Sequence, residues 1–285
     1  MSFDGSAIKA LLDGAVSKGA VHGIAALVVD RKGPLFHHAA GEASDRTVFR
    51  NASMTKAVAT TAALQFVEQG KLDLDATVES VLPEFGRLQQ HVYGPLAMTD
   101  SSFAPGAEQR ARLLRVMQRQ ADGKLAPSAL DLPATSEWDA AGHGSYGTIQ
   151  DYGRFVQAWL DDGAGILAPA TCEMALKNHL GPIRLPELLK STVPELSNDV
   201  PSLPVPQGWG LGFHLTLANL PGMRSAGTAD WAGVFNSYYW IDRTRGIGGV
   251  LMTQVLPFFD MPVIETLMGF EMAVYQQVGA VVPAV

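Results

Sequence analysis

The stretches of this 285-residue chain that favour β-strands lie at its two ends. Residues 23–29 are a continuous apolar run rich in β-branched side chains, and a second run at 35–40 follows a short turn, which predicts a hairpin. Near the other end, residues 211–217 alternate apolar with small or polar side chains, and apolar runs follow at 235–241 and 247–253. The simplest assembly of these stretches is one antiparallel sheet built from both ends of the chain.

The remaining parts of the chain carry helical patterns. Residues 57–67 form an Ala-rich run of eleven positions without a charged side chain, so we expect a buried helix, and Gly70 is a typical helix stop. Residues 262–278 repeat apolar side chains at helical spacing, which predicts a last helix. Its expected apolar face consists of Ile264, Leu267, Met268, Met272 and Val274 or Tyr275. Further helical segments are expected between residues 108 and 177.

These elements predict an α+β fold in a single domain over residues 1–285, in which the first and last helices cover an antiparallel sheet. The sheet lobe would comprise about residues 1–50 and 205–285, and the helical lobe about residues 51–204. Hydrophobic residues make up 47% of the chain, which is enough to bury a large core. The Pro-rich residues 200–206 are expected to form a loop that leads back to the sheet.

Charge and composition exclude several function classes. The net charge is −7 and no Lys/Arg cluster is present, so no nucleic-acid partner is expected. The sequence contains no run of eighteen apolar residues, so no membrane-spanning segment is expected. Residues 1–5 lack a secretory pattern, and Cys172 is the only cysteine, so we expect a cytoplasmic location with Cys172 as a buried apolar residue. The histidines show no metal-ligand spacing, and neither a metal nor a cofactor is expected.

Ser53 and Lys56 stand three residues apart at the head of the Ala-rich run. On a helix this spacing places both side chains on one side, so the amine can reach the hydroxyl. A serine hydroxyl is a weak nucleophile until a base removes its proton, and a lysine whose pKa is lowered by burial can be that base. If Ser53 is the first helical residue, the N–H groups of the first turn also favour a developing anion. The pair therefore suits acyl transfer through a serine ester.

The same spacing occurs a second time, at Ser6 and Lys9, so the pattern alone is weak. Ser6 lies in a polar segment, where a surface helix explains both residues. For Ser53 the structural alternative is an N-cap with Lys56 as a solvated residue of the first turn. The uncharged run that follows Lys56 favours the catalytic interpretation there. A lysine at the start of a buried helix is expected to have either a charged partner or a catalytic role.

Seven segments, in order along nearly the whole chain, carry a family resemblance. They are residues 49–56, 65–75, 94–100, 147–152, 231–233, 239–242 and 253–258. Together they resemble the beta-lactamase-related serine hydrolases, and most closely the esterases similar to class C beta-lactamases, often called family VIII carboxylesterases. The resemblance implies that Ser53 is the acylated nucleophile and that Lys56 shares or relays its proton. It also implies that the backbone N–H groups of Ser53 and Val234 form an oxyanion hole.

The resemblance further implies where a substrate lies. Trp231, Ala232 and Gly233 occupy the place where lactamases have a Lys-Thr-Gly strand, so Trp231 and Gly233 would contact substrate. For Trp231 a core position at the start of a strand is an equal alternative. Tyr146 lies in a Gly-rich loop that the family places beside the cleft. Since no lysine stands at this third motif to hold a carboxylate, an uncharged ester fits better than a beta-lactam.

One departure from the family concerns the general base. In the family a long segment, including the tyrosine that usually acts as base, precedes the region matched by residues 94–100. Here residues 86–92 join the flanking regions directly, so that tyrosine has no counterpart. Either the protein carries a deletion or the sequence omits residues, and an intact mass would show which. A neutral Lys56 is the most economical base; Tyr93 is more consistent with core packing, and Tyr146 and His143 are weaker candidates.

The sequence thus predicts a serine hydrolase that cleaves small carboxylic esters through an acyl-Ser53 intermediate. Acyl transfer or weak beta-lactam hydrolysis is the first alternative. An inactive relative that binds ligands in the former cleft is the second, and the missing tyrosine is its main support. The expected partner is a small-molecule ester, and the sequence leaves the oligomeric state open.

Overall fold

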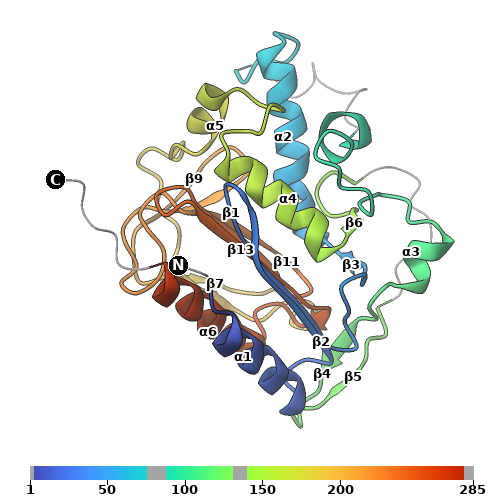
Figure 1. The fold of residues 1–285 in the computed structure, drawn as a ribbon. Coiled ribbons are helices and arrows are strands. Elements are labelled where there is room, and N and C mark those ends of the chain that lie inside the picture. The colour runs from blue at the N-terminus through green and yellow to red at the C-terminus, as the bar shows by residue number, and fades with distance from the viewer. Residues whose placement is uncertain (1–2, 76–87, 131–139, 279–285) are drawn as a thin grey trace.

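A seven-stranded antiparallel sheet forms the centre of the molecule (Figure 1). The computed structural model describes residues 3–75, 88–130 and 140–278. The strands follow the order β2-β1-β13-β12-β11-β10-β9, so both ends of the chain contribute to one sheet. Their bounds are β1 (Gly23–Asp30), β2 (Gly33–Gly41), β9 (Gln207–Trp209), β10 (His214–Thr216), β11 (Ala229–Gly233), β12 (Ser237–Asp242) and β13 (Ile247–Met252). The α+β fold expected from the sequence is confirmed.

Helices cover both faces of this sheet (Figure 1). Helices α1 (Ser6–Ser17) and α6 (Met261–Gln277) lie side by side on one face, and α2 (Thr55–Glu68) and α4 (Ile149–Leu160) lie on the other. Because successive side chains of a strand point to opposite faces, β1 contributes to two cores. Leu27 packs with the α2 and α4 side chains, whereas Val28 packs with those of α1 and α6. Burial on both faces accounts for the continuous apolar run in β1.

Short elements complete the chain. Two short helices, a five-residue helical turn and a 3₁₀ turn are α3 (Ala107–Ala111), α5 (Pro169–Ala175), η3 (Gln89–Tyr93) and η1 (Ala52–Met54). A three-stranded sheet consists of β14 (Val255–Leu256), β4 (Met117–Arg119) and β5 (Leu125–Pro127). Two strand pairs are β3 (Phe49–Arg50) with β6 (Tyr146–Gly147), and β7 (Leu188–Leu189) with β8 (Val200–Pro201). The lobe boundaries near residues 50 and 205 stay a prediction.

The expected strands are largely confirmed, with one correction in the second half of the chain. The hairpin of β1 and β2 and the strands β12 and β13 lie where their apolar runs predicted them. The continuous strand expected over residues 211–217 is wrong, because only His214–Thr216 is extended as β10. Gly212 has a φ of +85°, and Gly210 N–H donates to the Phe213 carbonyl, so the preceding residues form a tight turn.

The expected apolar face of the last helix is wrong at two positions. Met268 and Met272 are 50% and 45% exposed. The buried side chains of α6 include Val263, Phe270 and Val274, because the helix packs against both the sheet and α1. Met268 and Met272 are apolar but lie on the exposed side of α6, so the apolar side chains in the sequence extend beyond the face that is buried.

A network of largely buried charges ties α6 to strands β10 and β11 of the sheet. Arg224 forms ion pairs with Glu271 of α6 and with Asp230 of β11, and His214 Nδ1 lies 2.9 Å from Asp230 Oδ1. Burial by itself raises the pKa of Asp230, but the Arg224 and His214 charges outweigh burial and hold that pKa below its ordinary value. Removing one member would leave its partner charged and buried, which is strongly destabilising.

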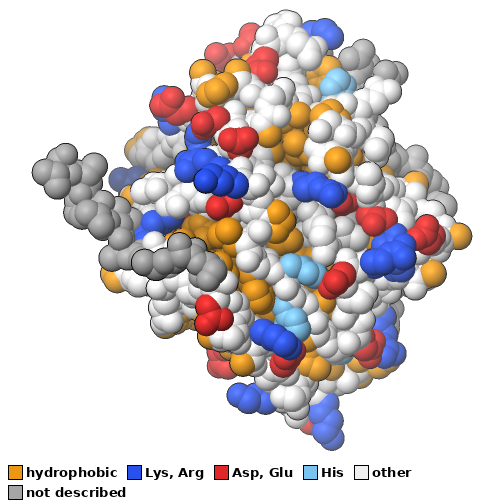
Figure 2. Space-filling model, in the orientation of Figure 1, with side chains coloured by type: hydrophobic (Ala, Val, Ile, Leu, Met, Phe, Trp, Pro, Cys, Tyr) orange, Lys and Arg blue, Asp and Glu red, His pale blue; other side chains and the backbone are white. Residues whose placement is uncertain are grey.

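The described part of the surface carries mixed charges. The face in Figure 2 shows Lys and Arg interspersed with Asp and Glu, without a continuous basic patch. In the residues that the structure describes, no helix is both long and apolar enough to cross a membrane. Within the same residues, no group of three His, Cys, Asp or Glu side chains could hold a metal ion. Cys172 is buried as expected, and burial raises the pKa of its thiol to about 11.

Candidate active site

Ser53 lies in the 3₁₀ turn η1, immediately before α2, and not at the first position of that helix. The preceding residue, Ala52, has a φ of +47°, a left-handed conformation that is strained for any residue but glycine. Asn51 anchors the turn, since its N–H donates to the Ser145 carbonyl at 2.9 Å. The backbone thus turns sharply at Ala52 and leaves Ser53 partly exposed while Met54 is buried.

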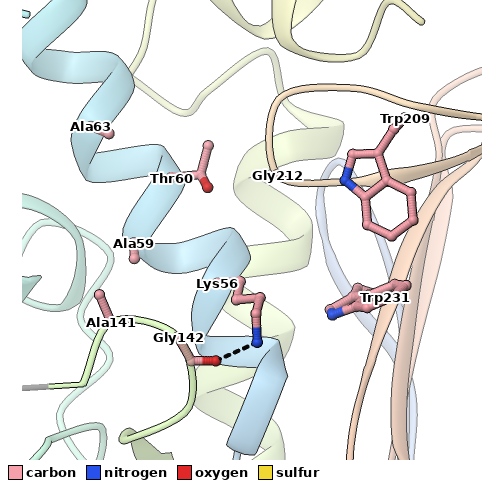
Figure 3. Close-up of a pocket in the computed structure, with 9 residues that line it drawn as sticks. All are labelled: Lys56, Ala59, Thr60, Ala63, Ala141, Gly142, Trp209, Gly212 and Trp231. Atoms are coloured by element: carbon pink, nitrogen blue, oxygen red, sulfur yellow. Dashed lines mark hydrogen bonds between the residues drawn. The ribbon is translucent and has the colours of Figure 1, made fainter. Parts of the chain in front are cut away.

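The Lys56 amine meets the Ser53 hydroxyl directly. Lys56 Nζ lies 2.7 Å from Ser53 Oγ. The same amine donates to the Gly142 carbonyl, also at 2.7 Å (Figure 3). Partial burial lowers the pKa of Lys56 below its ordinary value, and no nearby carboxylate of the described residues counteracts this shift. A lysine without an anionic partner is more readily deprotonated, and its neutral form can accept the serine proton.

A cleft of about 470 Å³ opens beside Lys56, and Ser53, which contacts the Lys56 amine, is not itself one of the described residues that line it. Its floor is one face of α2, formed by Lys56, Ala59, Thr60 and Ala63 at helical spacing, with Ala141 and Gly142 on one side and Trp209 and Trp231 on the other (Figure 3). Lys56 is the only charged residue among the described residues that line the cleft. The arrangement therefore suits an uncharged ligand beside the lysine amine.

Two tryptophans form one side of the cleft. The rings of Trp209, from β9, and Trp231, from β11, meet edge to face with centroids 4.7 Å apart. The Trp231 indole nitrogen is directed toward Lys56 (Figure 3), and it is buried without an acceptor among the described residues. The Trp209 ring also packs against His214, at 5.6 Å between centroids. The sequence singled out Trp231 but not Trp209, which lies beyond the matched motifs.

The end of β11 lies against the turn that carries Ser53. A Cβ at Gly233 would lie 2.6 Å from the Asn51 carbonyl oxygen, so only glycine permits this approach. Val234 packs in the small apolar cluster that contains Ala52. The backbone of Val234 therefore lies beside the turn that carries Ser53. The oxyanion hole formed by the N–H groups of Ser53 and Val234 stays a prediction.

Other predicted residues lie apart from the cleft. Tyr146, in β6, is opposite Arg50 of β3, with the guanidinium 5.9 Å from its ring centre, and it does not line the cleft among the described residues. Its contact with substrate stays a prediction. Tyr93 is buried, as expected for core packing, and His143 is exposed next to Gly142. The short connection at residues 86–92 lies partly outside the described residues.

The sequence did not identify the residues that support the turn from behind. The Tyr152 hydroxyl donates to the Met54 carbonyl at 2.9 Å. A buried Ser145 hydroxyl contacts Asn51 Nδ2 at 3.0 Å and Thr55 Oγ1 at 2.8 Å. The motif at residues 147–152 was the available signal for Tyr152, but the carbonyl that it contacts is 98 residues earlier in the chain.

Replacing Tyr152 with phenylalanine is expected to lower kcat about tenfold with little change in KM, because the Ser53 turn loses a positioning contact while the cleft is unaltered. Unfolding free energy should fall by about 1–2 kcal/mol. Tyr275→Phe is a matched control, since the Tyr275 hydroxyl is also buried and donates to Asp242 at 3.0 Å on the far face of the sheet. Steady-state kinetics and thermal unfolding test this. Equal loss of kcat in both variants would contradict a positioning role.

Comparisons with known proteins agree with this architecture. The family model described as Beta-lactamase matches residues 8–89 and 87–269, and the two segments meet where the sequence showed the short connection. Lovastatin esterase of Penicillium rubens is 26% identical over 208 residues, covering 68% of this chain and 51% of that protein. The chain thus spans about half the length of the curated relatives it matches.

Solved structures share the fold at low sequence identity. A mutant of simvastatin synthase (LovD) from Aspergillus terreus superimposes with a TM-score of 0.82 at 18% identity, over 95% of this chain and 94% of that chain. EstCE1, described as a hydrolase with promiscuous acyltransferase activity, has a TM-score of 0.74 at 17% identity, over 94% and 97% of the two chains.

Proposed function

This chain belongs to the beta-lactamase family, and we propose that it is a serine hydrolase that cleaves uncharged carboxylic esters through an acyl-Ser53 intermediate. The observation that carries the proposal is the distance of 2.7 Å between Ser53 Oγ and the Nζ of Lys56, which lines an open cleft. A serine that is only an N-cap would not need a lysine amine whose pKa is lowered beside it.

In the proposed mechanism, neutral Lys56 takes the proton of Ser53 Oγ as this oxygen attacks the ester carbonyl carbon. The N–H groups of Ser53 and Val234 stabilise the negative oxygen of the tetrahedral intermediate, each by about 3 kcal/mol. The protonated Lys56 then gives its proton to the departing alcohol oxygen. In the second half of the reaction Lys56 takes a proton from a water molecule as the water oxygen attacks the acyl carbon. The bond from that carbon to Ser53 Oγ then breaks, and Lys56 returns the proton to Oγ.

The chemistry of the cleft supports an uncharged substrate. Its described lining is apolar or small apart from Lys56 and Thr60. A negatively charged substrate would pair with the Lys56 ammonium and stabilise the protonated form, which cannot act as base. An ester without a carboxylate leaves the amine free to be neutral.

Acyl transfer to an alcohol is the second candidate. Its support is the structural likeness to EstCE1, which is described as a hydrolase with promiscuous acyltransferase activity. An alcohol that replaces water in the second half of the reaction would use the same Lys56 base. Adding butanol to the reaction and measuring the butyl ester by chromatography separates transfer from hydrolysis.

The test of the proposed function uses p-nitrophenyl acetate. We expect a burst of p-nitrophenol equal to the enzyme concentration, together with an acetyl mass increase on the peptide that contains Ser53. Acid quenching followed by peptide mass spectrometry measures the label. A burst without a label on Ser53, or the absence of any turnover, would refute the assignment.

A further inference from the structure

The cleft extends from Lys56 in one direction, along α2. We call the part over Lys56, Thr60 and Ala63 the α2 trough (Figure 3). From Lys56 to Ala63 the helix advances by seven residues, or about 10 Å. Gly212 touches the floor, since a Cβ there would lie 2.5 Å from Thr60 Oγ1. The trough therefore begins at the lysine amine, runs along α2 to Ala63 and is bordered at Thr60 by Gly212.

The position of Lys56 decides which part of an ester enters the trough. As Ser53 Oγ bonds to the carbonyl carbon, the bond from that carbon to the alcohol oxygen breaks. The proton that Lys56 took from Ser53 passes to this oxygen, so the oxygen must come within about 3 Å of Nζ. The group attached to the alcohol oxygen then continues away from Ser53, and the trough lies in that direction.

We propose that the α2 trough is the subsite for the alcohol part of the substrate, and that it takes an apolar alkyl or aryl group between the small floor of α2 and the Trp209–Trp231 pair. This inference rests on the proposed function of Ser53 and Lys56. Ala59 and Ala63 leave room for a chain along the helix, and the tryptophan rings give it an apolar side. Ala63 marks the far end of the subsite and sets the length of alcohol that fits.

Two isomeric esters test the proposal, octyl acetate and ethyl octanoate, which have the same atoms but carry the long chain on opposite sides of the carbonyl. Ala63→Leu fills the end of the trough. Because each buried methylene contributes about fourfold to binding, we expect kcat/KM for octyl acetate to fall at least about tenfold. The value for ethyl octanoate should change less than about twofold. Ala63→Val should give an intermediate loss with octyl acetate.

A second measurement separates the two halves of the reaction. Release of acetate from acetyl-Ser53 occurs after the alcohol has left, so its rate in Ala63→Leu should equal that of the wild type. Ala7→Leu is the matched control, because Ala7 is an exposed position of α1 outside the cleft. It should leave both esters and the melting temperature unchanged.

Three outcomes would contradict parts of this account. A larger loss with ethyl octanoate than with octyl acetate would show that the acyl part occupies the trough. Equal losses with both esters, in a folded Ala63→Leu or Ala63→Val protein, would show that the trough does not select the alcohol. If the wild type hydrolyses no ester at all, the proposed function fails and the subsite with it.

Discussion

Ser53→Ala should abolish the p-nitrophenol burst and the acetyl label, and lower turnover by at least about a thousandfold. Without the hydroxyl no covalent ester forms, and only uncatalysed attack by water remains. Ser53 is partly exposed, and the one side-chain contact described for it is with the Lys56 amine, so the melting temperature should change little. Stopped-flow absorbance and intact-protein mass measure the two losses.

Ser6→Ala is the matched control, because Ser6 and Lys9 repeat the same spacing at the start of α1. The structure gives Lys9 a different role, since its Nζ pairs with Asp13 at 2.7 Å on the surface. The burst should therefore be unchanged in Ser6→Ala. A Ser53→Ala protein with wild-type turnover would remove Ser53 from the mechanism.

Lys56→Ala should lower kcat/KM by about a hundredfold or more, because the proton of Ser53 then has no acceptor in place. Lys56→Arg should lose as much, since a guanidinium keeps its charge and cannot act as base. Both proteins should remain folded, because the Lys56 side chain is only partly buried. A large drop in melting temperature in both would instead indicate a structural lysine.

The same lysine predicts the pH dependence. The active form is the neutral amine, so kcat/KM of the wild type should rise as pH rises through the Lys56 pKa and then level off. Since burial lowers that pKa, the midpoint should lie below the ordinary lysine value of about 10.4. Rates corrected for uncatalysed hydrolysis give the profile. A rate that falls over this range would contradict neutral Lys56 as the base.

Local patterns predicted the fold well where one element carries its own signal. The run of β1 is apolar on both faces because both faces are covered, and Gly70 ends α2 with a φ of +65°. Strand β11 was indicated only by the family resemblance at Trp231–Gly233 and not by a local pattern, because it is five residues long and includes Asp230, whose charge is balanced by Arg224. That compensation comes from tertiary contacts and leaves no local pattern.

The candidate site divides in the same way. The contact of Ser53 with Lys56 was predictable because three residues along the chain correspond to one helical turn. Gly142, whose carbonyl accepts from the Lys56 amine, is 86 residues away, and Trp209 of β9 contacts Trp231 of β11 with β10 between their strands. Such contacts depend on how the chain folds back on itself, so neither spacing nor composition could indicate them.

The buried charges behind the sheet have a consequence for engineering. The Trp209 ring rests on His214, which is joined through Asp230 and Arg224 to Glu271 on α6. The Trp209 side of the cleft is thus connected to α6, which covers the opposite face of the sheet. Libraries for directed evolution of ester selectivity should therefore include α6, although none of its residues is among the described residues that line the cleft.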